Sequence, residues 1–326
     1  MKPVVGIIFN PYARINRKQK NVQIRLMEEI LGEKALIRVT WTQEDIIPVL
    51  KEFKEAGIKI IGISGGDGTI SSVVSAYLNS FGDLEVPIII PIKGGTMNIV
   101  ASEVGIKTNQ AETCTILSKY LKDGTVPIIE KGTIRITDPR YRYPILYAFT
   151  WADGLIYRFI KHYYKEGGGK AKALKLMFKT AFLYLINPDN SYFSEIKSKV
   201  YIDAEEIPFE SHLFIFASSL ERTVFGFRVF KEKIETGENF GVLYVKYSFL
   251  QKSFYRIPLF LYFGINTDPS KIVISQVAKT LTVEGNMGYT FDGEVYDPDK
   301  EGYVKLEAGP KIKIISPKGK PISIRS

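Results

Sequence analysis

The chain has 326 residues, of which 45% are apolar and 24% charged, and its formal net charge is +9. This length and apolar content suffice for one large or two ordinary domains, and they exclude a disordered chain. The single cysteine, Cys114, excludes an internal disulfide framework and a cysteine-rich metal site, so we expect a reducing compartment. The excess of positive charge favours a polyanionic partner, which could be nucleic acid, an anionic membrane surface or a phosphate-rich ligand.

The first segment, MKPVVGIIFN, has an apolar stretch that is too short for a signal peptide and is followed by no small-residue cleavage site. No run of 18 or more apolar residues occurs in the sequence. We therefore expect a cytoplasmic protein that does not span a membrane.

Short apolar, β-branched runs alternate with helical patterns through the first 130 residues. The runs occupy residues 3–10, 35–40, 58–63 and 86–92, and patterns such as QIRLMEEILG and DIIPVLKEFKEAG lie between them. Strands that are apolar on both faces and alternate with helices predict a doubly wound parallel sheet. We expect an α/β domain over residues 1–130.

After residue 130 the pattern changes to alternating apolar and polar residues, as in GTIRIT, HLFIFASS and YVKLEAG. Alternation of this kind predicts an antiparallel β-sandwich, here interrupted by one or two helical stretches. We assign this mostly-β domain to residues 131–315, and leave open whether the tail 316–326 returns to the first domain. An active site is expected in the cleft between the domains.

The stretch SGGDGTI, residues 64–70, follows an apolar strand and precedes a helical pattern. Such a glycine-rich turn binds anions, because free backbone amides and the positive end of the helix dipole point the same way. The backbone amides of Gly65, Gly66, Gly68 and Thr69 could therefore hold phosphates. The alternative is a tight structural turn with Asp67 or Thr69 as the helix N-cap. The spacing is neither the Walker pattern nor G-x-G-x-x-G.

This stretch resembles the diacylglycerol kinase catalytic family, which includes sphingosine kinases and bacterial homologues. GGDGT alone marks a superfamily, because NAD kinases and, loosely, phosphofructokinases share it. Three further motifs narrow the resemblance: Asn10-Pro11 with Thr40-Trp41-Thr42 after the first two strands, GGTMNIVA at residues 94–101, and FDGEVYDPD at 291–299. Asn10-Pro11 matches the N-P signature of the family, and Thr40-Trp41-Thr42 lies where the family has a threonine facing the nucleotide. GGTMNIVA matches the G-T-x-N motif, and FDGEVYDPD matches the D-G-E motif.

The resemblance implies an NAD-kinase-like and diacylglycerol-kinase-like fold, with ATP and Mg²⁺ as cofactors. Nucleotide contacts are expected from Asn10, Thr42, Gly65, Gly66, Gly68, Thr69, Gly95, Thr96 and Asn98, although Asn10-Pro11 could be simply a turn. One departure stands out: the second motif commonly reads G-T-x-N-D, whereas Ile99 follows Asn98 here. This departure leaves the identity of the lipid open.

Three carboxylates are the candidate catalytic groups. Asp67, beside the phosphates, could accept the proton of the attacking hydroxyl or hold Mg²⁺ with the nucleotide, and a separate structural metal site is left open. Asp292 and Glu294 are expected on one side of a strand, because side chains two residues apart share a face. The alternative for this pair is an exposed turn.

The basic segment RFIKHYYKEGGGKAKALKLMFKTAFLYLINPD, residues 158–189, predicts a helix over residues 170–185 with lysines beside an apolar and aromatic face. The lysines of the segment are Lys161, Lys165, Lys170, Lys172, Lys175 and Lys179, and the apolar residues are Leu174, Met177, Phe178, Phe182 and Leu183. This pattern is typical of an interfacial helix on anionic lipid, and equally of a helix packed on the sandwich with solvated lysines. SFYRIPLFLYFG, residues 253–264, is a second candidate. His162 and His212 are isolated in the sequence, so we do not expect a histidine-based catalytic or metal site.

Taken together, the motifs predict an ATP-dependent lipid kinase that phosphorylates a diacylglycerol-like or sphingoid-like hydroxyl. We expect peripheral binding to the anionic inner face of the membrane and no nucleic-acid partner, because no usual nucleic-acid module occurs. The oligomeric state stays open, with a homodimer among the options. The alternatives are a non-catalytic lipid- or nucleotide-binding regulatory protein of the same fold and, less favoured because its Asn-Glu motif is missing, an NAD kinase.

Overall fold

The computed structural model describes residues 3–84, 86–141, 143, 145–165, 170–187, 190–222, 229–230, 232–247 and 273–324. The chain forms two compact units: the first unit consists of residues 1–131 and 311–326, and the second unit of residues 132–310. The predicted domain boundaries lie at 130/131 and 315/316, and the compact units divide at 131/132 and 310/311.

The first unit has a parallel sheet with helices on both faces. Its strands are β1 (Val5–Phe9), β2 (Ala35–Val39), β3 (Ile60–Gly65), β4 (Ile88–Lys93), the start of β5 (Thr125–Thr137), the end of β17 (Tyr303–Ile315) and β18 (Lys320–Ser323). Its helices are α1 (Arg14–Leu31), the 3₁₀ turn η1 (Gly32–Lys34), α2 (Ile46–Glu55), α3 (Asp67–Phe81), α4 (Ile99–Glu103) and α5 (Gln110–Asp123).

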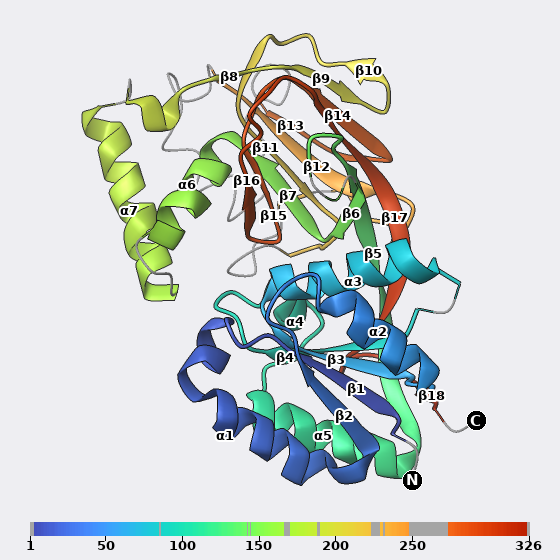
Figure 1. The fold of residues 1–326 in the computed structure, drawn as a ribbon. Helices are drawn as coiled ribbons and strands as arrows, with labels where there is room; N and C mark the ends of the chain where they lie inside the picture. The colour runs from blue at the N-terminus through green and yellow to red at the C-terminus, as the bar shows by residue number, and fades with distance from the viewer. Residues whose placement is uncertain are drawn as a thin grey trace. The chain divides into compact units, whose positions relative to one another are not determined.

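Strands β2, β1, β3 and β4 are neighbours in this order and run parallel, and the end of β17 joins β4 in parallel. Helices α1 and α5 cover one face of the sheet and α2 and α3 the other (Figure 1). Every residue of β1 and β3 is buried, as strands covered on both faces require. The α/β prediction is therefore confirmed.

The register of these strands determines where the motifs meet. Phe9 of β1 pairs with Ser64 of β3, and Gly65 pairs with Lys93 of β4. The segments that follow the three strands therefore leave the sheet at one edge, the carboxyl edge, where ligands of open α/β sheets bind.

The second unit is mostly antiparallel β-structure. Its strands are the rest of β5 and β17 with β6 (Ile145–Ala148), β7 (Thr150–Asp153), β8 (Ile196–Lys197), β9 (Lys199–Ile202), β10 (Glu205–Glu206), β11 (Ser211–Ser218), β12 (Phe240–Lys246), β13 (Val273–Ala278), β14 (Thr280–Glu284), β15 (Tyr289–Phe291) and β16 (Glu294–Tyr296). Its helices are α6 (Gly154–Lys165), α7 (Lys170–Ile186) and the 3₁₀ turn η2 (Ser191–Phe193).

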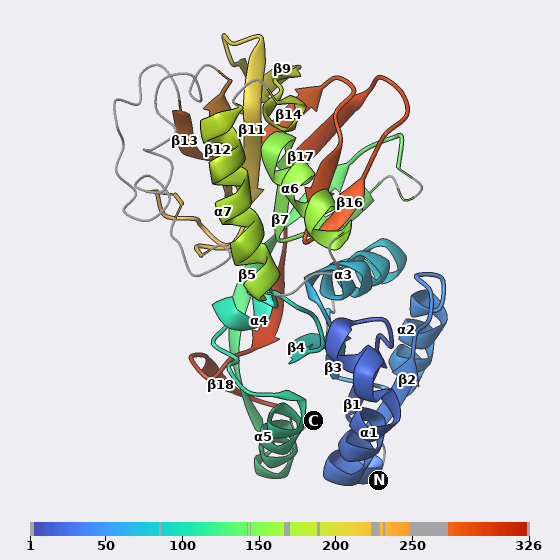
Figure 2. The ribbon, with the colours of Figure 1, turned by 90° about the vertical axis from the view of Figure 1, so that its left-hand side faces the viewer.

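Two antiparallel layers enclose the core of this unit. One layer has the order β13-β12-β11-β7-β15-β16, and the other contains β10-β9-β14-β17 with β5 and β6. Their inner side chains form one cluster, in which Trp151, Tyr244 and Tyr289 are fully buried. Helix α6 packs on β11, and α7 lies beside α6 in both views (Figures 1 and 2). The prediction of a mostly-β second domain is confirmed. Among the described residues, no helix is long and apolar enough to span a membrane.

Candidate functional site

The turn after β3 brings bare backbone to the carboxyl edge of the sheet. Helix α3 begins at Asp67, and its first intrahelical hydrogen bond runs from the Ile70 N–H to the Gly66 C=O at 3.2 Å. The amides of residues 66–69 therefore precede the helical ladder, at the positive end of the helix dipole. A Cβ on Gly65 would lie 2.5 Å from the Thr69 side chain, so the turn requires glycine there. This geometry suits an anion.

The turn after β4 packs directly against the first turn. The Gly94 and Gly95 N–H groups both donate to the Gly65 C=O, at 2.9 and 3.0 Å. A Cβ on Gly95 would lie 2.5 Å from the Gly66 Cα, so any side chain at position 95 would push the two backbones apart. The paired glycines therefore allow the two turns to form one continuous backbone surface.

Asp67 connects the two turns. It is 7% exposed, and its carboxylate accepts hydrogen bonds from the Ile99 N–H at 2.9 Å and the Val100 N–H at 3.0 Å. Burial raises the pKa of Asp67 above its ordinary value, and these two hydrogen bonds act in the opposite direction. The carboxylate thus caps the start of α4, rather than the start of its own helix as the structural alternative expected. The backbone N–H groups of Asp67 itself and of Asn98 also bond the carboxylate.

Both candidate asparagines make hydrogen bonds within this surface. The Asn10 amide donates to Thr69 Oγ1 at 2.8 Å, so Asn10 contacts the glycine motif. Asn10 Oδ1 accepts the Tyr12 N–H at 2.9 Å, so Asn10-Pro11 also forms a turn. Asn98 has a left-handed backbone, with φ of 50°, and its side chain bonds the N–H and C=O of Gly95 at 3.2 and 3.0 Å. Asn98 therefore holds the second turn in shape.

A buried polar network, which sequence reasoning missed, supports these turns from below. Asn16 is fully buried, and its amide donates to the Asn10 C=O at 2.7 Å and the Ser64 C=O at 3.0 Å. The Gln110 amide donates to Asn16 Oδ1 at 2.6 Å and to the Lys93 C=O at 3.0 Å. Asn16 lies in the first turn of α1. Two helix residues thereby fix the ends of β1, β3 and β4.

Two exposed aromatic side chains lie beside the ends of β1 and β2. Tyr12 is 63% and Trp41 48% exposed, and their ring centroids are 5.8 Å apart. The Lys20 Nζ lies 4.0 Å from the centroid of the Trp41 ring. Large exposed rings of this kind offer a stacking surface for a planar group.

Thr42, a predicted nucleotide contact, lies in the exposed loop after Trp41. The N–H groups of Trp41 and Thr42 donate to Asp45 Oδ2 at 2.7 and 2.9 Å. These bonds lower the pKa of Asp45 below its ordinary value, with the bond from Thr42 contributing most. Asp45 thus holds the loop that carries Trp41, and the role of Thr42 toward nucleotide stays a prediction.

The expected geometry of the acidic pair is wrong. Asp292 and Gly293, with φ of 45° and 88°, form the two-residue turn of a hairpin in which Phe291 pairs with Glu294. Positive φ at both central residues is what a type I′ turn requires, and Asp-Gly is its usual sequence. The two carboxylates are therefore separated by a turn and do not share a strand face.

Asp292 and Glu294 have different surroundings. Asp292 is 7% exposed, and its carboxylate accepts the Phe149 N–H, the Thr150 N–H and the Thr150 hydroxyl, each at 2.8 Å. It therefore ties the hairpin to the start of β7. Glu294 has an exposed side chain, yet desolvation by the surrounding protein raises the pKa of its carboxyl. Glu294 is thus the better placed of the two to meet a ligand.

His212 belongs to a buried polar group in the second unit. It is fully buried, its Nε2 lies 2.7 Å from Asp153 Oδ2, and its Nδ1 lies 3.3 Å from Ser198 Oγ. Asp153, also fully buried, accepts the Ile215 N–H through its other oxygen at 2.6 Å. The group links β7 to β11 inside the second unit. Within the described residues, no set of three or more His, Cys, Asp or Glu residues could hold a metal ion.

Helix α7 exposes aromatic residues together with lysines. Phe178 and Phe182 are 70% and 64% exposed, whereas Ala173 and Leu176 are buried against Tyr163. Lys172, Lys175 and Lys179 are exposed on the same helix. The side chains of Lys170, Leu174 and Met177 lie outside the described part of the structure, as does the whole segment 253–264. The exposed phenylalanines fit an interfacial helix better than a helix whose aromatic face packs inward.

Comparisons with known proteins place this geometry in context. Residues 4–127 match the family model of the diacylglycerol kinase catalytic domain. The chain is 32% identical over 104 residues to the probable lipid kinase YegS of Escherichia coli O127:H6 and of Shigella flexneri. The matched stretch covers 32% of this chain and 34% of each relative, so it spans only about a third of the curated relatives.

Two solved structures from Bacillus anthracis strain Sterne resemble the whole chain. One is described as a diacylglycerol kinase and the other as a putative diacylglycerol kinase, with TM-scores of 0.64 and 0.67. They cover 97% of this chain and 97% and 98% of their own length, at 15% and 16% sequence identity. At this identity the likeness establishes the fold of both units.

Proposed function

We propose that this chain is an ATP-dependent lipid kinase, because its residues 4–127 match the family model of the diacylglycerol kinase catalytic domain. It transfers the γ-phosphoryl group of Mg·ATP to a lipid hydroxyl. The observation that carries the proposal is the backbone surface formed by the two glycine turns, where Gly66 and Gly95 touch at the amino end of α3. Phosphoryl transfer depends on positioning and on charge stabilisation, and this surface can provide both.

The triphosphate would lie along the two turns. The amides of Gly66, Gly68 and Thr69 would donate to its oxygens, with Gly65 close by. From the second turn, Thr96 would contribute its amide, while Gly95, whose N–H already donates to the Gly65 C=O, would allow close approach because it has no side chain. Asn10 supports this arrangement through its hydrogen bond to Thr69 Oγ1 at 2.8 Å. Asn98 supports it through the two bonds that shape the second turn. Mg²⁺, bound with the nucleotide, would neutralise phosphate charge.

Asp67 is the proposed proton acceptor. The lipid hydroxyl oxygen bonds to the γ-phosphorus, the bond between that phosphorus and the β,γ-bridging oxygen breaks, and ADP leaves with the electron pair. The hydroxyl proton passes to the Asp67 carboxylate, whose position is fixed by the Ile99 and Val100 amides. Alternatively, the same carboxylate would act as a ligand of the metal ion.

The nucleotide base would stack on Trp41. Trp41 is exposed beside the end of β2, and the loop that carries it is held by two hydrogen bonds to Asp45. A base of any identity presents a π-face to such a ring. Thr42, the next residue, could then bind the sugar or base through its hydroxyl.

The second unit would supply the acceptor. We assign Glu294 as a catalytic carboxylate toward the lipid and Asp292 as the residue that positions its hairpin, since Asp292 bonds Phe149 and Thr150. The acceptor is a diacylglycerol-like or sphingoid-like alcohol. The exposed lysines and phenylalanines of α7 would bring the protein to an anionic membrane surface.

One observation favours a second candidate, a non-catalytic nucleotide- or lipid-binding protein of the same fold. Ile99 stands where the second motif commonly has a carboxylate, and both oxygens of Asp67 accept backbone N–H groups at the start of α4. If Asp67 served only to cap α4, nucleotide would bind without turnover.

Incubation with Mg·ATP and detergent micelles of a diacylglycerol or a sphingoid base distinguishes the two. The kinase proposal predicts ADP in equal amount to a phosphorylated lipid. Binding of ATP by calorimetry with no ADP formed over any micelle would favour the non-catalytic protein, and failure to bind ATP at all would refute the kinase and any nucleotide-binding role.

A further inference from the structure

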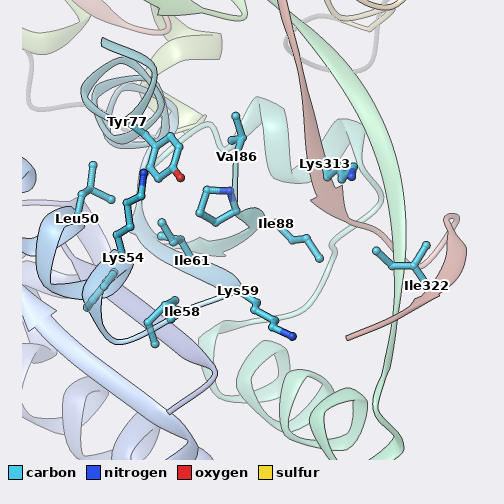
Figure 3. A pocket seen from close by; sticks show the side chains of 13 residues that line it. Leu50, Lys54, Ile58, Lys59, Ile61, Tyr77, Val86, Ile88, Lys313 and Ile322 are labelled. Carbon is cyan, nitrogen blue, oxygen red and sulfur yellow. The ribbon is translucent and has the colours of Figure 1, made fainter. Parts of the chain in front are cut away.

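The first unit contains a cavity of about 430 Å³ at the edge of the sheet opposite the glycine turns (Figure 3). Its apolar floor is formed by Ile58, Ile61 and Ile88, which lie at the starts of β3 and β4. All three are buried, and Ile61 is only 1% exposed. The volume lies within the range of small-molecule sites in proteins.

Three elements distant in sequence wall this cavity. Leu50 and Phe53 come from α2, Tyr77 from α3, and Ile322 from β18, near the end of the chain. Leu50 and Phe53 are each 1% exposed, and Tyr77 is 6% exposed. The wall is therefore rigid core structure, and the cavity is preformed.

The rim of the cavity is cationic. Lys54, Lys59 and Lys313 line it with exposed side chains, and in Figure 3 they surround the isoleucines from different elements. The Lys54 Nζ lies 4.6 Å from the centroid of the Phe81 ring, and the Lys59 Nζ lies 3.4 Å from the Ile324 C=O. Among the described residues that line the cavity, none is acidic. An apolar floor with three lysines on its rim is complementary to a molecule with an apolar tail and an anionic head.

This cavity is separate from the proposed phosphate surface. Strand β3 runs from Ile60, beside the cavity, to Gly65, where the first glycine turn begins. A strand of six residues spans about 20 Å, at roughly 3.3 Å per residue. No residue of the glycine turns lines the cavity.

We propose that the cavity is a binding site for a single-chain anionic amphiphile, with an acyl or alkyl tail on the isoleucine floor and a phosphate or carboxylate head at the three lysines. This site goes beyond the proposed kinase activity, because its ligand need not be a substrate. Burial of the tail supplies most of the affinity, and the lysines select an anionic head over a neutral or cationic one.

Tail length gives the first test. Each methylene that enters the cavity should tighten binding about fourfold, from the transfer free energy of one buried CH₂. We would titrate octyl, decyl and dodecyl phosphate below their micellar concentrations by calorimetry, with a saturating non-hydrolysable ATP analogue present so that the glycine turns are occupied. Inorganic phosphate and decyltrimethylammonium serve as comparison probes. We expect affinity to increase with tail length and neither comparison probe to compete.

Variants locate the site. The change of Lys54, Lys59 and Lys313 together to Gln should weaken dodecyl phosphate binding about tenfold, as three exposed charge interactions of ordinary strength would. A matched control changes three exposed lysines outside the cavity, Lys51, Lys119 and Lys122, to Gln and should alter the affinity less than twofold. Val86→Phe, which places a ring in the cavity from the segment before β4, should abolish binding.

Thermal unfolding without ligand checks that each variant is folded, and the lysine variants carry the test if Val86→Phe does not fold. Binding equally strong in the parent and in the Lys54/Lys59/Lys313 variant would overturn the proposal. So would competition by inorganic phosphate alone, which would mark a simple anion site, or equal binding of all three chain lengths. The experiment measures binding of the amphiphile and not phosphoryl transfer. It therefore tests this site even if the protein has no kinase activity.

Discussion

Replacement of Asp67 by Asn is the change whose effect the structure defines most sharply. The carboxylate accepts the Ile99 and Val100 amides with one oxygen each. An asparagine has a single oxygen, so its NH₂ group would face one of these amides and leave it without an acceptor. Loss of one hydrogen bond to a charged, buried group destabilises the folded state by about 1.5–3 kcal/mol. Removal of a buried charge offsets part of this cost, since burial raises the pKa of Asp67.

We expect the effect on turnover to exceed the effect on stability. Loss of a general base reduces turnover roughly 10²-fold or more, while the glycine turns keep their backbone amides and ATP binding stays measurable. Turnover would be measured with saturating Mg·ATP and a short-chain lipid, ATP binding by calorimetry, and unfolding with denaturant. Val73→Ala is a matched control, because Val73 is fully buried in the same helix and lies away from the carboxylate.

The pH dependence gives the same test a second readout. The base must be ionised, and burial raises the pKa of Asp67 above 3.8. Turnover in the parent should therefore rise with pH through a midpoint above that value, and Asp67→Asn should remove this rise. Full turnover in Asp67→Asn would refute the catalytic role and leave Asp67 as the cap of α4. The same conclusion would follow if Val73→Ala, at an equal free energy of unfolding, lost as much turnover as Asp67→Asn.

The remaining predictions concern the phosphate turns, the base and the membrane. Gly66→Val should abolish ATP binding in calorimetry, because the side chain would occupy the place proposed for phosphate. The protein should still fold and show its thermal transition, because a Cβ on residue 66 meets nothing closer than the Gly95 Cα at 3.4 Å. Normal ATP binding by this variant would mean that the two turns have only a structural role. ATP should change the emission of Trp41, since the other tryptophan, Trp151, is fully buried, and Trp41→Ala should cost about 1–3 kcal/mol of ATP affinity; unchanged emission and affinity would contradict stacking. Replacement of Lys170, Lys172, Lys175 and Lys179 by Gln should lower the partition coefficient of the protein onto anionic vesicles about a hundredfold, if three of the four lysines contribute fully at low salt. Sedimentation that is insensitive both to this change and to 1 M salt would show that α7 does not dock on lipid.

Strong local signals made the first unit predictable. The runs at 58–63 and 86–92 are apolar on both faces, and they became the buried strands β3 (Ile60–Gly65) and β4 (Ile88–Lys93). Three glycines around Asp67 marked the turn after β3 as the candidate phosphate site, because glycine spacing constrains the backbone directly. The second glycine pair, at positions 94 and 95, is needed because Gly95 contacts Gly66. This contact depends on the order of the strands in the sheet, so only the structure could reveal it.

Residues that act across long sequence separations were not predictable. Asn16 and Gln110 are 94 positions apart, and a polar residue in a helical pattern is normally expected to face solvent. The same holds for His212 and Asp153, which meet across two strands. The hairpin at Asp292-Gly293 is different, because Asp-Gly between two short strand patterns is a turn signal that outweighs period-two alternation.

The most direct test of the central claim is transfer of label from [γ-³²P]ATP to lipid. The protein would be incubated with labelled ATP, Mg²⁺ and a panel of extracted lipids, and products identified by thin-layer chromatography and mass spectrometry, with Asp67→Asn as the matched control. The account predicts a labelled phospholipid whose mass exceeds that of its parent alcohol by one phosphoryl group, formed by the parent protein and at least roughly 10²-fold more slowly by the variant. Label that remains in ATP with every lipid of the panel, or that appears in lipid equally fast with the variant, would contradict it.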